Sequence, residues 1–173
     1  MELHMHSHHF TRRMPDWRAA AIAGFSAGVV FLVIEMVALW MMGENPLGPP
    51  RMIAAIVMGP DVLSQAGTGA GVMLAALIIH FVLSIVFGLI LAVIMAPFSF
   101  DSSVGMASLA GAVFGVAVYL INFYGMTRVF PWFAEARGGV SFLAHVVFGL
   151  VAADAYLKLE RKEAGASEAD LTG

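Results

Sequence analysis

The stretch that decides the fold is GVMLAALIIHFVLSIVFGLILAVIMA, residues 71–96, in which His80 is the only ionisable side chain. At a rise of about 1.5 Å per residue, a helix of this length crosses the ~30 Å hydrocarbon core of a bilayer. No Asp, Glu, Lys or Arg interrupts the stretch, and such a charge costs roughly 2.5–3.5 kcal/mol at the centre of a span. We therefore predict a transmembrane helix.

Three further runs of about 20 or more mostly apolar residues lie at residues 19–42, 104–123 and 138–157. Across the whole chain 60% of the residues are hydrophobic and 12% are charged, whereas soluble domains have about 45–50% and about 25%. The sequence thus predicts an all-α membrane protein, with a four-transmembrane-helix bundle formed by residues 19–157.

The first loop, residues 43–70, contains a short apolar stretch at residues 52–58. A proline pair, residues 49–50, precedes this stretch, and proline favours the first turn of a helix, whereas Gly59 and Pro60 end it. We expect a short interfacial helix that lies at the membrane surface or over the mouth of the bundle. An extended apolar loop is the alternative.

Positively charged residues indicate the orientation, because cytoplasmic segments carry an excess of Lys and Arg. Those on the side of the two tails are Arg12, Arg13, Arg18, Lys158, Arg161 and Lys162, and those on the other side are Arg51, Arg128 and Arg137. We therefore expect a bacterial inner-membrane protein with both termini in the cytoplasm.

The two tails differ in composition. Residues 1–18 form a tail with His and Arg, and residues 158–173 form a charged tail that we expect to be mostly disordered. The first tail contains His4, His6, His8 and His9. Clustered histidines can bind a metal ion, so they are either a candidate metal site or a solvated cluster.

Two pairs of segments repeat along the chain. They are residues 23–29 (AGFSAGV) with 110–116 (AGAVFGV), and residues 80–84 (HFVLS) with 145–149 (HVVFG). Glu35 and Asn122 stand at the same distance after the first glycine of each first segment. We therefore predict two repeated helical hairpins related by an axis along the membrane normal, with glycines that let the helices approach closely.

Four polar side chains fall at similar depths in the predicted spans. Glu35 and His145 lie roughly 10 Å below the outer ends of their helices, His80 lies about 13 Å below, and Asn122 lies near the outer end of its span. Ionisable groups in lipid need a partner or a function. We therefore expect these four residues to form one intramembrane cluster that faces the interior of the bundle.

Four interpretations of this cluster stay open. Its groups could hydrogen-bond one another and specify helix pairing, or form a protonation or ion-binding site open to the periplasm, because histidine titrates near neutral pH. Alternatively, His80 and His145 could be axial ligands of a haem b, or the His and Glu side chains could bind a divalent metal or copper. We expect no resident cofactor. Arg128, Glu135 and Arg137 in the following outer loop could form a lid over the cluster.

Several function classes are disfavoured. The chain has no cysteine, and it shows no nucleophile–base pair, phosphate-binding glycine loop or carboxylate pair, so we do not expect an enzyme. The formal net charge of -3 and the lack of a basic stripe argue against nucleic-acid binding. The expected partners are the lipid bilayer and, at the small-residue helix faces, a second copy or a larger membrane complex.

Residues 77–91 and 109–162 resemble the YagU-like small inner-membrane proteins of bacteria. This resemblance rests on HFVLSIVF from His80, on LAGA at 109–112, and on PWFAE at 131–135 leading to His145. A second resemblance, to hypothetical bacterial proteins of which some are labelled sodium:proline symporter, rests on GPPRMIAAI at 48–56 and NFYG at 122–125. The YagU-like resemblance implies an association with acid tolerance.

We therefore expect a small non-enzymatic membrane protein that responds to pH or ions through a periplasm-facing Glu/His/Asn cluster. The alternative is an accessory or assembly subunit of a larger respiratory or transport complex, in which the cluster is structural.

Overall fold

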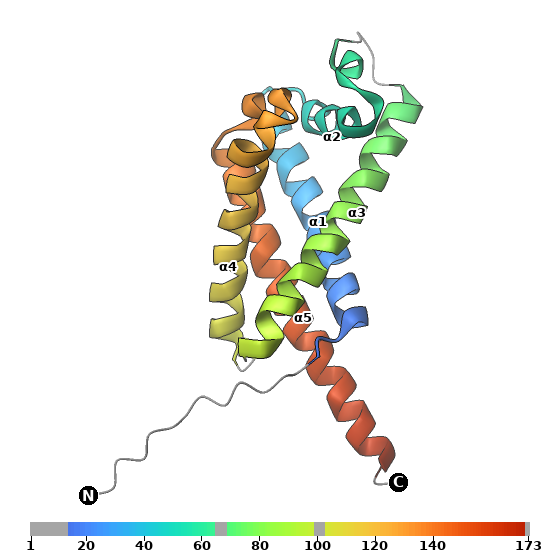
Figure 1. Ribbon diagram of the computed structural model, residues 1–173, viewed down its shortest axis with the longest axis vertical. Coiled ribbons are helices and arrows are strands. Elements are labelled where there is room, and N and C mark those ends of the chain that lie inside the picture. Colours follow the sequence, from blue (N-terminus) through green and yellow to red (C-terminus); the bar gives the residue numbers. More distant parts are fainter. Residues whose placement is uncertain (1–13, 65–68, 99–102, 172–173) are drawn as a thin grey trace, which may run out of the picture.

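The structure, a computed structural model, describes residues 14–64, 69–98 and 103–171 (Figure 1). It confirms the all-α class, because four helices are long and apolar enough to cross a membrane and no strand occurs in these ranges. The four helices are α1 (Trp17–Met41), α3 (Ala70–Met95), α4 (Val104–Leu120) and α5 (Gly139–Leu171). Each begins within two residues of a predicted span. The tail histidines lie outside the described residues.

Local sequence explains where several helices begin. The carboxylate of Asp16 accepts a hydrogen bond from the Ala19 N–H at 2.9 Å and caps α1, and Ser103 caps α4 in the same way. The short helix α2 (Gly48–Met58) has the predicted prolines in its first turn. The sequence prediction of a short helix in the first loop is therefore confirmed.

The long helices pack in the order α3–α1–α5–α4, so that α1 and α5 are central. Helices α3 and α4 make few contacts with each other, and they diverge toward the end of the bundle at which α2 lies (Figure 1). We call this the α2 end. The start of α1 and the end of α5 lie at the opposite end, the tail end (Figure 1).

The two predicted hairpins, α1–α3 and α4–α5, pack through equivalent glycines. A Cβ atom at Gly24 would lie 2.5 Å from the carbonyl oxygen of Ser84 and 3.1 Å from the Cα of Gly88. At the corresponding position of the second hairpin, a Cβ at Gly111 would collide with the carbonyl oxygen of Gly149. Both hairpins therefore depend on glycine for close backbone approach.

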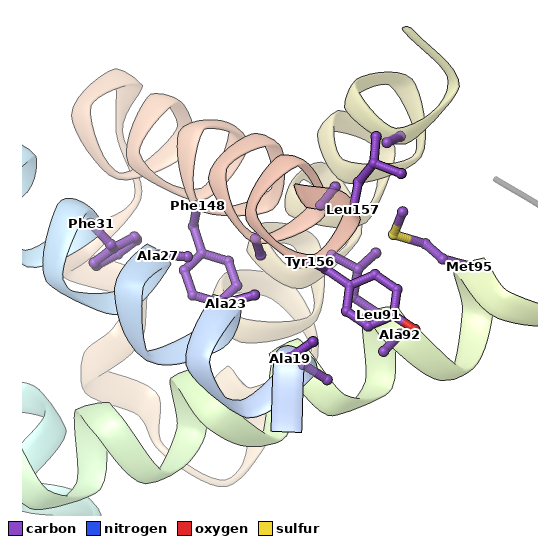
Figure 2. Close-up of a cluster of buried hydrophobic side chains, with 14 of the residues drawn as sticks. Ala19, Ala23, Ala27, Phe31, Leu91, Ala92, Met95, Phe148, Tyr156 and Leu157 are labelled. Carbon is purple, nitrogen blue, oxygen red and sulfur yellow. The ribbon is translucent and has the colours of Figure 1, made fainter. Parts of the chain in front are cut away.

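Figure 2 shows a cluster of buried hydrophobic side chains between α1, α3 and α5, which extends into the tail half of the bundle. Ala19, Ala23 and Ala27 of α1 are buried in one cluster with residues of α3 and α5. The largest fully buried side chains of the described residues also lie there, and they are Leu91, Met95, Tyr156 and Leu157. The small residues of α1 bring the central helices close together, which leaves the α2 half as the more open part.

Two segments differ from the sequence expectation. After Leu120 the third span continues as a π-helical turn, η3 (Ile121–Gly125), and two short 3-10 helices, η4 (Met126–Arg128) and η5 (Pro131–Ala136), follow. Helix α5 continues to Leu171, so the backbone of 158–171 is helical where we expected mostly disorder. This segment is rich in Ala, Glu and Lys, which are strong helix formers, and it extends a helix that is already nucleated.

Candidate functional site

A cavity of about 390 Å³ lies in the α2 half of the bundle. Helices α1, α3, α4 and α5 form its walls, and α2 and the 126–136 segment form its roof. We call it the main cavity. Most of the side chains that line it are aliphatic or aromatic.

All four residues of the predicted polar cluster line the main cavity. Glu35 comes from α1, His80 from α3, Asn122 from the π-helical turn η3, and His145 from α5. The side chains of Glu35, His80 and His145 are buried, and that of Asn122 is partly buried. The structure thus brings together one polar group from each transmembrane segment.

The carboxylate of Glu35 is bonded to the other hairpin. The hydroxyl of Ser141, in the first turn of α5, donates to Oε1 of Glu35 at 2.9 Å, and both side chains are buried. This bond joins α1 to α5. The second oxygen of the carboxylate has no hydrogen-bond partner among the described residues, and it can accept or, when protonated, donate another bond.

The imidazole of His145 is held at both nitrogens. Nδ1 lies 2.7 Å from the carbonyl oxygen of Ser141, which can only accept, so Nδ1 carries a proton. In the neutral ring Nε2 is then an acceptor, and the side-chain amide of Asn122 donates to it at 3.2 Å. The amide oxygen of Asn122 keeps no partner within the described part of the chain.

His80 has the opposite tautomer. Its Nε2 lies 2.9 Å from the carbonyl oxygen of Gly28 and donates to it, which leaves Nδ1 of the neutral ring as an acceptor. Among the described residues, no fully buried side-chain nitrogen or oxygen lacks a partner. The unpartnered atoms of His80 and Asn122 therefore reach accessible space, and the main cavity is the space that both residues line.

The ring of Phe31 packs against both imidazoles, with centroid distances of 5.6 Å to His80 and 4.8 Å to His145. Nε2 of each histidine is also hydrogen-bonded within the protein, so the pair does not fit axial ligation of a haem in this arrangement. In the ranges that the structure describes, no group of three or more His, Cys, Asp or Glu side chains is placed to hold a metal ion.

A second cavity of about 440 Å³, which we call the vestibule, lies between the end of α1, the start of α2 and the start of α5. Of the three predicted lid residues, Glu135 and Arg137 line the vestibule, whereas Arg128 lines neither cavity, and all three are exposed. Ser141 also lines the vestibule, while its partner Glu35 lines the main cavity. The Ser141–Glu35 bond therefore lies between the two cavities.

Arg137 has a positioning role that the sequence did not reveal. Its Nε donates to the carbonyl oxygen of Phe123 at 2.6 Å, and its guanidinium lies 4.5 Å from the ring centroid of Tyr124. Both Phe123 and Tyr124 belong to η3. Arg137 thus holds the π-helical turn that carries Asn122.

Apolar residues close the main cavity. They are Pro49, Met52, Ile53 and Ile56 of α2, and Phe130 and Phe133 of the segment after η4. The indole Nε1 of Trp132 donates to the Met52 carbonyl oxygen at 3.0 Å and ties the two parts of this roof together. The spacing of the apolar residues in 49–56 is typical of one helix face, and it was the signal in the sequence for this part of the roof.

Comparison of the chain with protein-family models, with curated proteins and with solved structures gives no match.

Proposed function

We propose that the protein is a small non-enzymatic protein of the bacterial inner membrane, with both termini in the cytoplasm, that responds to protons or small cations from the periplasm. The Ser141–Glu35 hydrogen bond carries this proposal, because it joins the vestibule to the main cavity. Charged side chains of Glu135 and Arg137 line the vestibule and offer water and ions a polar approach to Ser141. The resemblance to YagU-like proteins, a group associated with acid tolerance, agrees with such a response.

Uptake of a proton by His145 would reverse its hydrogen bond to Asn122. The neutral ring accepts from the amide at Nε2, whereas the protonated ring donates from both nitrogens. The amide must then turn so that its oxygen accepts, and its NH2 group faces the main cavity. The titratable groups that face this pair from other helices are Glu35 on α1, His80 on α3 and Tyr119 on α4. One proton would thus change an acceptor on the cavity wall into a donor.

Nuclear magnetic resonance of the protein in lipid nanodiscs, with labelled His and Asn side chains, tests this response as the pH is lowered from neutral to the acidic limit at which the protein stays folded. We expect the imidazole signal of His145 and the amide signal of Asn122 to move with one midpoint, and His145→Gln identifies the first signal by its loss. The matched control is His9→Gln in the N-terminal tail, which should leave both signals unchanged. A His145 signal that stays constant over this range contradicts the proposal.

A further inference from the structure

We propose that the main cavity binds a neutral, apolar molecule of the bilayer that carries a hydroxyl group. Such a ligand would enter between α3 and α4 and place its hydroxyl against the polar cluster. This inference goes beyond the response to protons or ions and does not depend on it.

The size and lining of the cavity suit an apolar ligand. Ligand pockets usually measure about 300–1,000 Å³, and a dry cavity of ~150 Å³ already holds benzene. The main cavity, at about 390 Å³, therefore has room for an alkyl chain or a ring system. Its walls include Phe31, Phe87 and Phe148, whose rings offer broad apolar contact.

The cavity opens toward lipid between two helices that scarcely meet. Leu83 of α3 and Ile121, directly after α4, both line the cavity, and their side chains are 37% and 57% exposed. Helices α3 and α4 make few contacts and diverge here, so exposed residues that also line the cavity point to an entrance between them. Because both edge residues are aliphatic, the entrance admits molecules dissolved in the bilayer.

The unpartnered polar atoms on the cavity wall favour a ligand that carries a hydrogen-bond donor. Nδ1 of His80 and the amide oxygen of Asn122 are both acceptors without a protein partner among the described residues. A hydroxyl group can donate to one of them and remain neutral. A charged head would lose most of its hydration among the surrounding apolar side chains, which is costly. The geometry therefore favours an alcohol over an alkane.

Photocrosslinking tests the proposal with a long-chain alcohol and an alkane of the same length, each carrying a diazirine, in nanodiscs at neutral pH. We expect the alcohol to label the peptides that contain Leu83 and Ile121, and unlabelled alcohol to compete about tenfold better than alkane, the effect of one net hydrogen bond. Asn122→Leu removes an acceptor and should reduce the advantage of the alcohol severalfold, while thermal unfolding shows that the variant is folded.

Two substitutions in one helix provide the matched control. Val118→Trp fills the cavity from its wall, whereas Val113→Trp adds the same side chain on a 62% exposed position that does not line the cavity. We expect the first to abolish labelling and the second to preserve it. Equal labelling by alcohol and alkane, or equal loss in both variants, overturns the proposal. Since no titration is involved, this result is independent of the resonance experiment on His145.

Discussion

Gly115 of α4 lies directly against the backbone of α5. A Cβ at this position would collide with the carbonyl oxygen of His145 and lie 2.9 Å from the Cα of Val146. Because backbone atoms cannot move aside as a flexible side chain can, Gly115→Ala should separate the helices and lower the free energy of unfolding by about 1–3 kcal/mol. Denaturation in detergent, followed by circular dichroism, measures this loss.

Gly105 in the same helix is the matched control for Gly115. A Cβ added there has no neighbour within 4 Å. Gly105→Ala should therefore be neutral or raise the stability by up to about 1 kcal/mol, because alanine favours the helix. If both variants lose a similar amount of stability, the loss in Gly115→Ala does not come from the contact with α5.

Single residues also show which parts of the site the sequence could predict. The rise per residue fixes depth, so Glu35, His80, Asn122 and His145 could be placed at one level of the bundle. Their partners depend on how each helix is rotated about its axis, which spacing does not determine. The repeat relates Glu35 to Asn122 but does not identify their partners, and the carboxylate of Glu35 bonds to Ser141 of the other hairpin.

At the scale of elements, α2 covers the main cavity and is tied to η5 by the indole of Trp132. Trp132→Phe keeps an aromatic ring but removes the donor, and a net hydrogen bond contributes about 0.5–1.5 kcal/mol. We expect backbone hydrogen exchange in α2 to become severalfold faster, while exchange in the centre of α5 stays unchanged. Mass spectrometry of the exchanged peptides measures the difference.

Trp40→Phe controls for the loss of an indole as such, because Trp40 is 71% exposed at the end of α1 and lines neither cavity. It should leave exchange in α2 at the wild-type rate. Unchanged exchange in Trp132→Phe would show that packing against α3, and not the indole, holds α2 over the cavity.

The long helices were predictable from the length of their apolar runs, and the start of α2 from the prolines that mark it locally. The π-helical turn after α4 was not, because no local residue marks it and Arg137 holds it from the next segment. The length of α5 was missed for a different reason. Charged composition suggested disorder, but a helix that is already formed extends at little cost through residues of high helix propensity.

The arrangement of the whole molecule departs from the symmetry of its repeat. A two-fold axis along the membrane normal would relate the α1–α5 interface to an equal interface between α3 and α4. The first is extensive and the second is slight, and the main cavity lies where the missing interface would be. The small-residue motifs lie within each hairpin, so the sequence could predict the hairpins but not how they join.

Orientation decides which compartment the vestibule faces, and the lack of cysteine in the chain makes it measurable. Glu44→Cys lies in the vestibule wall, and Met14→Cys lies at the tail end, where Met14 is 71% exposed. We expect a membrane-impermeant maleimide to label Glu44→Cys in intact spheroplasts and Met14→Cys only after lysis, because the excess of Lys and Arg favours a cytoplasmic tail end. The reverse pattern would expose Ser141 and Glu35 to cytoplasmic ions, and a response to the periplasm would then be impossible by this route.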